Sequence, residues 1–401
     1  MSKLDELIAE LCPDGVEYAS IGSLIKRIRE RGKDDISVQQ VYVVSNSLGI
    51  VRAEDYRDNT IHSEDTSNYT IIRKNMFAYN PSRLNIGSIA MLKEEEPGLV
   101  SPMYVVFSID ETQIVKEYFE YVLKSPYVMN KINSYKEEGA RFRFNFDRWD
   151  WIRIPLPPLP VQQEIVRILD NFTELTAELT AELTARRKQY EYYRDLLLMF
   201  DDKPEVKWMT LGEICKKVSS GGTPPTSNKE YYGGNVPWLR TQEVDFNYIY
   251  DTGVKITEAG VKNSSAKWIP ENCVIVALYG ATAAKVAINK IPLTTNQACC
   301  NLQVDETKAL YRYVFHWLSS QYLKLKALGQ GSQSNINAKT VKEYPIPVPP
   351  LEEQERIVAI LDRFDALCND LTSGIPAEIE ARQKQYEYYR DKLLSFKEVT
   401  A

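Results

Sequence analysis

The chain has 401 residues, more than one hydrophobic core usually supports, so at least two domains are expected. Its apolar share of 44% and charged share of 26% are those of an ordinary globular protein. The sequence contains no run of eighteen apolar residues, the length needed to cross a membrane as a helix. The net charge of −6 does not favour nucleic-acid binding unless basic residues cluster locally. The six cysteines form no CxxC pair and the N-terminus lacks signal-peptide character, which together favour a reducing, cytoplasmic location.

An internal repeat is the strongest feature of the sequence. Residues 154–170, IPLPPLPVQQEIVRILD, return 192 positions later as IPVPPLEEQERIVAILD at 346–362. RKQYEYYRDLLLMF at 187–200 returns as RQKQYEYYRDKLLSF at 382–396, now shifted by 196 positions, so the second copy contains four extra residues. Weaker matches align 16–28 with 206–218, and 139–145 with 331–337.

The repeated stretch predicts a long helix after each pair of prolines, because proline ends the preceding strand. In the first copy, apolar residues recur at alternating spacings of three and four: Ile165, Ile168, Phe172, Leu175 and Leu179. Residues 357–371 of the second copy show the same spacing. This is the a/d pattern of a coiled coil, although simple core packing would also produce it.

The first helix is predicted over residues 161–199 and contains TAEL twice, at 176–179 and 180–183. A four-residue unit slightly exceeds one turn, so removing one shortens a helix by about 6 Å while nearly preserving its apolar face. Glu182 and Arg186 form a favourable i, i+4 pair. The second helix contains Gly374 and Pro376, which should kink it or divide it in two.

These patterns predict an α+β protein made of two similar halves and two long helices that pair antiparallel and hold the halves at a fixed distance. Strands are expected at 103–107, 272–280 and 285–289, and helices at 118–125 and 311–328. The predicted domains are two globular halves at 1–153 and 201–345, and two helical spacers at 154–200 and 346–401.

The loop YNPSRLNIGS at 79–88 is the first cluster of candidate contact residues. It superficially resembles the (D/N/S)PP(Y/F) motif of amino-methyltransferases, but Ser82 and Arg83 replace the second proline and the aromatic residue, and no FxGxG-type cofactor loop accompanies it. As a loop it offers groups suited to base edges and phosphates: Tyr79, Asn80, Arg83, Asn85 and Ser88.

The second cluster is GARFRFN at 139–145 with its counterpart GQGSQSNIN at 329–337. At equivalent positions Arg141 corresponds to Gln333, and Arg143 to Asn335. Arginine suits guanine while asparagine and glutamine suit adenine, so the two halves would read different bases. Further candidates in these segments are Asn145 and Gln330. The alternative is an amphipathic edge strand with solvated arginines.

The third cluster lies in the Gly/Pro-rich stretch 220–244 together with LTTNQ at 293–297. Gly222 and Thr223 form a turn that would place backbone N–H groups near phosphate. The other candidates of this half are Arg240, Lys285, Asn296 and Gln297. An ordinary surface loop is the alternative. A local basic patch comprises Lys26, Arg27, Arg29, Arg31 and Lys33, for which a solvated helical face is the alternative.

Motifs for catalysis are missing from the sequence. His62 and His316 are the only histidines, and neither has a cysteine or histidine at metal-ligand spacing. The sequence contains no GxxxxGK[ST], GxSxG or HExxH motif. We therefore predict no catalytic residue and no metal site.

The duplicated helix motif, the TAEL tandem and QYEYYRDLLL together resemble the specificity subunits of type I restriction–modification systems, in particular the subgroup with TAEL repeats. YNPSRLNIGS with VSPMYVVF at 100–107, and GGTPPTSNKEYYGGNVPWLRT with TTNQ, are similar to target-recognition sequences of that family. The resemblance covers nearly the whole chain.

This resemblance implies two target-recognition domains, each reading one half of a bipartite, asymmetric site in double-stranded DNA. The helices would dock two methyltransferase subunits, which bind S-adenosylmethionine, so no cofactor is expected in this chain. Motor–nuclease subunits would complete the restriction complex, and no membrane is involved. The expected partner-facing residues are Tyr190, Tyr193, Tyr386 and Tyr389.

Three other functions remain open at this point. The chain could be a self-contained modification enzyme, which binding of the cofactor by the isolated chain would support. It could be a two-headed helical adaptor that binds proteins, which sequence-selective DNA retardation would exclude. A specificity subunit that serves methylation alone is also compatible with the sequence.

Overall fold

The chain divides into two compact units in the computed structural model. Unit 1 comprises residues 1–178 and 379–401, and unit 2 comprises residues 179–378. The structure describes residues 3–56, 65–135, 142–200, 203, 205–329, 335–370 and 372–399. The predicted spacers 154–200 and 346–401 are each shared between the two units in this division.

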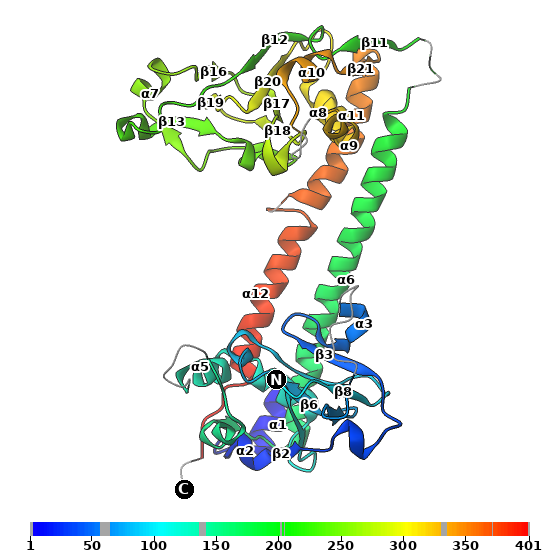
Figure 1. Ribbon diagram of the computed structural model, residues 1–401, viewed down its shortest axis with the longest axis vertical. Helices are drawn as coiled ribbons and strands as arrows, with labels where there is room; N and C mark the ends of the chain where they lie inside the picture. Colours follow the sequence, from blue (N-terminus) through cyan, green and yellow to red (C-terminus); the bar gives the residue numbers. More distant parts are fainter. Residues whose placement is uncertain are drawn as a thin grey trace. The chain divides into compact units, whose positions relative to one another are not determined.

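Unit 1 contains an antiparallel sheet, a mixed sheet, a small strand pair and several short helices (Figure 1). Its elements before the long helices are α1 (Lys3–Leu11), β1 (Tyr18–Ser20), α2 (Ile21–Leu24), β2 (Ile25–Ile28), β3 (Val41–Ser45), β4 (Gly49–Arg52), α3 (Ala53–Tyr56), β5 (Thr70–Ile72), β6 (Phe77–Tyr79), β7 (Ile89–Met91), β8 (Gly98–Val100), β9 (Val105–Ile109), α4 (Lys116–Leu123), α5 (Pro126–Ser134) and β10 (Arg153–Pro155). The described strands form sheets of order β2-β9-β6-β7 and β4-β3-β8-β5, and a β1-β10 pair.

Unit 2 repeats this plan with one additional strand. Its elements are β11 (Lys207–Thr210), β12 (Cys215–Ser220), β13 (Tyr232–Leu239), β14 (Asn247–Ile249), β15 (Lys255–Ile256), α7 (Glu258–Lys262), β16 (Trp268–Ile269), β17 (Val274–Ala277), β18 (Val286–Asn289), β19 (Leu293–Thr295), β20 (Cys299–Val304), α8 (Tyr311–Ser320), α9 (Tyr322–Ala327), α10 (Ala338–Glu343) and β21 (Pro345–Val348). The described strands pair in the orders β12-β20-β17-β18-β14, β15-β13-β19-β16 and β11-β21. The predicted α+β class is confirmed, and β9, β17 and β18 occupy the predicted strand regions, while the predicted helix at 311–328 is divided into α8 and α9.

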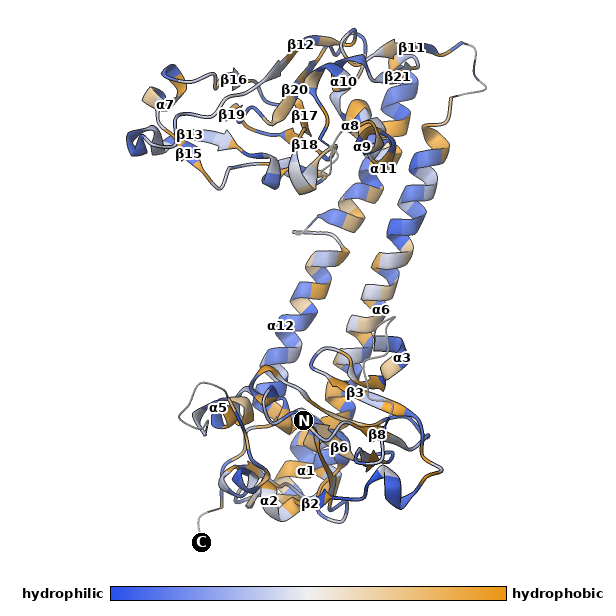
Figure 2. Ribbon diagram, in the orientation of Figure 1, coloured by the Kyte–Doolittle hydropathy of each residue, from blue (hydrophilic) through white to orange (hydrophobic). Residues whose placement is uncertain are grey.

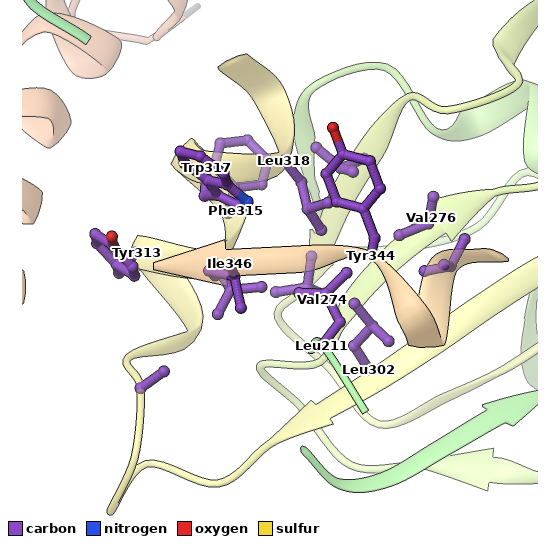
Figure 3. Close-up of a cluster of buried hydrophobic side chains, with 14 of the residues drawn as sticks. Leu211, Val274, Val276, Leu302, Tyr313, Phe315, Trp317, Leu318, Tyr344 and Ile346 are labelled. Atoms are coloured by element: carbon purple, nitrogen blue, oxygen red, sulfur yellow. The ribbon is translucent and has the colours of Figure 1, made fainter. Parts of the chain in front are cut away.

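The core of unit 2 lies between its main sheet and α8. Val274, Val276 and Leu302 of the sheet pack with Phe315 and Leu318 of α8 (Figure 3). The helix α12 (Ile375–Leu393), in contrast, is mostly hydrophilic (Figure 2).

The long helices begin and end close to the predicted positions. The first, α6, runs over Leu159–Leu197 and includes both TAEL units. Glu182 of the second unit and Arg186, one turn later, form the predicted ion pair at 3.4 Å. The second is divided into α11 (Leu351–Asn369) and α12 (Ile375–Leu393), as Gly374 and Pro376 predict. A side chain at Gly374 would lie 2.6 Å from the carbonyl oxygen of Ala366, so this tight break requires glycine.

Within each unit, two helical segments pair through equivalent stacked rings. In unit 1, Phe172 of α6 stacks on Tyr389 of α12, with ring centroids 5.5 Å apart. In unit 2, Phe364 of α11 stacks on Tyr193 of α6 at 5.6 Å. These pairs are related by the sequence repeat, and each joins a residue that follows the proline pair to one of the QYEYYRD segment.

The predicted apolar seam is only partly buried. Ile165 and its counterpart Ile357 are fully buried, but Leu175 and Leu367 are 46% and 38% exposed. The predictions that Leu175 and Leu367 belong to a buried seam are therefore wrong. Leu371 lies outside the described residues.

The start of each long helix is fixed to its domain by a buried glutamine. The amide oxygen of Gln162 accepts the Val115 N–H at 2.8 Å, and its NH₂ group donates to the carbonyl oxygens of Gln113 and Pro157 at 3.0 and 2.7 Å. Gln354 repeats the arrangement in unit 2. Its amide oxygen accepts the Leu310 N–H at 2.9 Å, and its NH₂ group donates to the carbonyl oxygens of Lys308 and Pro349 at 3.2 and 2.8 Å. One side chain thus satisfies three backbone groups that no strand or helix pairs.

We expect Gln162→Leu to lower the free energy of unfolding by roughly 1–3 kcal/mol, because it leaves buried backbone groups without partners. Gln163 is the neighbouring residue and is exposed, so Gln163→Leu serves as the matched control. Chemical denaturation of the two variants checks the difference. Equal stabilities would show that the buried amide contributes nothing.

Candidate nucleic-acid interface

In unit 1 the structure brings the first two predicted clusters together. The Phe144 N–H donates to the carbonyl oxygen of Pro81 at 2.9 Å, and the Tyr79 hydroxyl donates to the carbonyl oxygen of Phe144 at 3.4 Å. The β6–β7 loop therefore lies beside the segment 142–145. Arg83, Arg143 and Asn145 are exposed on these two segments, and Asn85 is half-buried.

Three predicted contact residues of this loop are structural instead. Tyr79 is fully buried, with its ring 5.8 Å from that of Trp149. Asn80 is 8% exposed, and its side-chain oxygen accepts the Ser82 N–H at 2.9 Å. Ser88 is 3% exposed and lies 3.4 Å from the Val44 carbonyl oxygen. The prediction that these side chains contact a ligand is corrected: they face inward and hold the loop in shape.

Part of the predicted basic patch adjoins this surface on a strand, whereas Lys33 lies in the short 3-10 helix Gly32–Asp34 that Arg31 precedes. Lys26 and Arg27 are the exposed residues of β2, and Arg29 is exposed immediately after it. The Arg27 guanidinium lies 5.9 Å from the ring centroid of Phe146, next to Asn145. Burial raises the pKa of Tyr79, and its interaction with the Trp149 side chain and the charges of Arg27 and Arg143 oppose that effect. Unit 1 thus has a local cationic surface despite the net negative charge of the chain.

In unit 2 the third predicted cluster assembles around Gly222. Its N–H donates to the Thr295 carbonyl oxygen at 2.9 Å, so the predicted phosphate contact by this N–H is corrected. A side chain at the preceding Gly221 would overlap Thr295, which explains why glycine stands there. Thr223 and Gln297 are hydrogen-bonded to each other, and Gln297 is exposed.

The remaining polar residues of unit 2 have partners within the unit. Lys285 pairs with Asp245, and Arg240 lies 3.8 Å from Glu243. The Asn296 side-chain oxygen accepts the Ala298 N–H at 3.1 Å and Asn296 is half-buried. Asn335 is exposed, and its side-chain oxygen accepts the Gly280 N–H at 3.3 Å. Arg141, Gln330, Gln333 and His62 lie outside the described residues.

The four predicted partner-facing tyrosines make intramolecular contacts. Tyr193 and Tyr389 form the helix stacks described above, while Tyr190 and Tyr386 pack against the cores of units 2 and 1. Sequence reasoning missed their neighbours. Tyr192 and Tyr388 are 64% and 62% exposed, and each makes an edge contact with the next tyrosine, at 5.4 and 5.3 Å between ring centroids. The segment YEYY contains three tyrosines within one turn of helix, so the helical period alone does not identify which of them faces solvent.

Comparison with known proteins decides the family. A family model described as the type I restriction modification DNA specificity domain matches residues 16–186 and again 204–381, which together are most of the chain. The chain belongs to this specificity-domain family. The two matches correspond to the two predicted halves, each with its following helix.

Individual relatives agree with this assignment. The specificity subunit of the type I restriction enzyme EcoR124I/EcoR124II from Escherichia coli is 41% identical over 310 residues, covering 74% of each chain. A putative type I restriction enzyme specificity subunit from Haemophilus influenzae is 34% identical over 259 residues, covering 61% of this chain and 64% of the relative.

Solved structures share the fold of this specificity-domain chain. The crystal structure of a type I restriction–modification S subunit from M. genitalium matches with a TM-score of 0.56 at 14% identity, covering 95% of this chain and 96% of that chain. A chain from a study of type I restriction–modification complex assembly matches with a TM-score of 0.63 at 18% identity, covering 95% and 98%. Sequence identities this low show that the fold is shared and nothing more. Separately, no described helix is long and apolar enough to span a membrane.

A buried polar network joins the second specificity domain to its helices. His316 of α8 is fully buried, with Nε2 2.7 Å from Asp362 of α11 and Nδ1 3.2 Å from the Tyr190 hydroxyl of α6. Arg312 donates to Asp362 at 3.0 Å and to Asp365 at 3.3 Å. In the first specificity domain, Tyr121 takes the place of His316 and donates to Asp170 at 2.6 Å.

The imidazole of His316 is neutral at neutral pH. Burial lowers its pKa, and Asp362 opposes this effect without overcoming it. A neutral imidazole donates from Nε2 to Asp362 and accepts from the Tyr190 hydroxyl at Nδ1, which satisfies both ring nitrogens.

We expect this histidine to make folding sensitive to mild acid. Because the unfolded chain has an ordinary histidine pKa of about 6.5, it binds more protons than the folded state below that pH. The free energy of unfolding should therefore fall as pH falls from 7.5 to 5.5, by up to about 1.4 kcal/mol per pH unit. Denaturation curves at several pH values should show a weaker dependence in His316→Gln than in wild type. An unchanged dependence in His316→Gln would contradict the assignment.

Proposed function

We propose that this chain directs a type I modification or restriction complex to its DNA site, with each specificity domain contacting one half of a bipartite, asymmetric sequence. The observation that carries this proposal is the divergence of equivalent surfaces. Where unit 1 exposes Arg143, unit 2 exposes Asn335 at the position related by the repeat. Arginine favours guanine and asparagine favours adenine, so one scaffold used twice would read two different half-sites.

The exposed cations of unit 1 make DNA contact compatible with a net charge of −6. Arg27, Arg83 and Arg143 would meet phosphates or base edges, and the exposed Asp147 is an acidic residue in the same part of the unit. A partner that also contacts the DNA would supply further phosphate neutralisation.

The chain itself is non-catalytic in this proposal. Its relatives are named specificity subunits, and its sequence has no cofactor-binding loop. S-adenosylmethionine would bind to the partner methyltransferase, motor–nuclease subunits would join for restriction, and the complex would work in the cytoplasm, where the DNA is.

The proposal is tested by mapping methylated bases in a methylase-free bacterial host. The host expresses the cognate methyltransferase with and without this chain. A gapped, asymmetric adenine-methylated motif that appears only with the chain supports the proposal. A stable complex that retards no DNA sequence-selectively would favour a protein-binding adaptor and overturn it.

The continuous helix α6 would set the distance between the two half-sites. Its threonines do not interrupt it, because their hydroxyls bond to carbonyl oxygens one turn earlier, as in Thr176 to Phe172 at 2.8 Å and Thr184 to Thr180 at 3.0 Å. Each TAEL unit can therefore be gained or lost as an intact turn of helix.

We expect deletion of Thr180–Leu183 to change the number of unspecified base pairs between the half-sites without changing either half-site sequence. Removing four residues shortens a helix by about 6 Å, which is one to two base pairs at about 3.4 Å each. Methylome mapping of the deletion variant measures the gap. A variant with the original gap, or with altered half-site bases, would contradict this role for the helix.

Two copies of the methyltransferase would dock on the two helix pairs. Tyr192 of unit 2 and Tyr388 of unit 1 are related by the repeat, equally exposed and backed by a second tyrosine. Large exposed aromatic residues are typical centres of protein interfaces. Two equivalent faces favour two copies of one partner over two different partners.

We expect Tyr192→Ala and Tyr388→Ala each to weaken retention of one methyltransferase copy, and the double variant to lose both. Native mass spectrometry of the co-purified complex measures the ratio of subunits. Tyr127→Ala removes a tyrosine of α5 that is 48% exposed and should leave the ratio unchanged. Full retention of two copies by the double variant would exclude this docking face.

A further inference from the structure

The β17–β18 loop, residues 278–285, is the counterpart of the β6–β7 loop of unit 1. Each loop joins the two equivalent strands of the main sheet. The Ile336 N–H donates to the Leu278 carbonyl oxygen at 3.0 Å, as Phe144 N–H does to Pro81 at 2.9 Å. Sequence reasoning passed over this loop, apart from Lys285 at its end, because its sequence, LYGATAAK, contains little charge or amide.

This loop touches every polar cluster predicted for unit 2. Its Leu278 N–H donates to the Ala298 carbonyl oxygen at 2.8 Å, next to Gln297. Its Thr282 hydroxyl donates to the Thr241 carbonyl oxygen at 2.8 Å, next to Arg240. Its Gly280 N–H donates to the Asn335 side chain at 3.3 Å. The separate candidates of unit 2 therefore converge on residues 278–282.

The backbone of this loop is also held by packing and hydrogen bonds. A backbone fixed in this way is suited to presenting side chains for recognition, unlike an ordinary surface turn. Ala283 and Ala284 are fully buried, and Ala284 holds a positive φ of 68°, which alanine rarely adopts. The backbone is closed by hydrogen bonds from Ala284 N–H to Ala277 at 2.8 Å and from Lys285 N–H to Thr282 at 2.9 Å. Tyr279, 42% exposed, is the large side chain that this fixed backbone presents to solvent.

We propose that the β17–β18 loop is the base-reading loop of the second specificity domain, with Tyr279 as its principal contact and Asn335 beside it. Tyr279 stands where unit 1 has Ser82, and Gly280 where unit 1 has Arg83. Asn335 keeps its NH₂ group for donation, because its oxygen already accepts the Gly280 N–H. The second half-site would thus be read by an aromatic ring and neutral hydrogen bonds, in contrast to the arginines of unit 1. The assignment rests on the proposed DNA-specificity function.

The test compares methylated motifs and duplex affinities of complexes assembled with the full-length chain and its methyltransferase. Tyr279→Ala should bind the wild-type duplex about tenfold or more weakly and should relax one or two base pairs of one half-site. Arg143→Ala should relax the opposite half-site. Tyr279→Phe separates the hydroxyl from the ring: it retains the affinity that comes from ring contact.

The matched control is Tyr250→Ala. Tyr250 is 68% exposed and follows β14, which runs parallel to β18 with Ile249 opposite Asn289, so it lies at the other end of β18 from the loop. This variant should keep the wild-type motif and affinity.

Two results would overturn the assignment. The first is that Tyr279→Ala retains the wild-type motif and affinity. The second is that it weakens binding to all sequences equally, which indicates a contact with the DNA backbone. If the wild-type complex itself shows no sequence-selective methylation, the proposed function fails and the assignment fails with it.

Discussion

The buried glutamine at the start of each long helix is the interaction on which the rest of each unit depends. The proline pair before the helix removes backbone donors, and the short helix of the domain begins with an N–H that has no helical partner. The side chains of Gln162 and Gln354 join these segments, and each does so with three hydrogen bonds from a fully buried amide. The helix therefore leaves its domain in a fixed direction, and the loops of the domain can diverge without disturbing that junction.

The repeat is also strict where helices contact helices. The stacks of Phe172 on Tyr389 and of Phe364 on Tyr193 have the same interplanar angle, 24°. One layer further into the domain, Asp170 and Asp362 both accept a hydrogen bond, but from a tyrosine in unit 1 and a histidine in unit 2. Only the second junction holds a histidine, and burial lowers the pKa of its imidazole below the value it has in the unfolded chain, so the two otherwise similar units differ in their response to acid.

The first long helix could be predicted from the sequence to within two residues, and the break in the second could be predicted from Gly374 and Pro376, because prolines, glycine and heptad spacing are local signals. Which polar residues face outward could not. Tyr79, Asn80 and Ser88 belong to a polar segment, yet they are buried: the ring of Tyr79 packs against Trp149, and Asn80 and Ser88 lie against backbone groups of Ser82 and Val44. The β17–β18 loop was missed for the opposite reason: an alanine-rich segment has no compositional signal, and only its backbone hydrogen bonds place it at the centre of the candidate surface.

The two units share the backbone of these loops but differ in the exposed side chains. This difference affects how much stability a change of DNA specificity would cost. Substituting an exposed side chain usually changes the free energy of unfolding by no more than about 0.5 kcal/mol, whereas changing a buried one costs several times as much. Arg83, Arg143, Tyr279 and Asn335 are exposed on loops whose backbone is held by buried neighbours. Their identities can therefore change almost independently of folding. The buried residues of the same loops cannot, because Tyr79 and Ala284 set the backbone that aims those side chains.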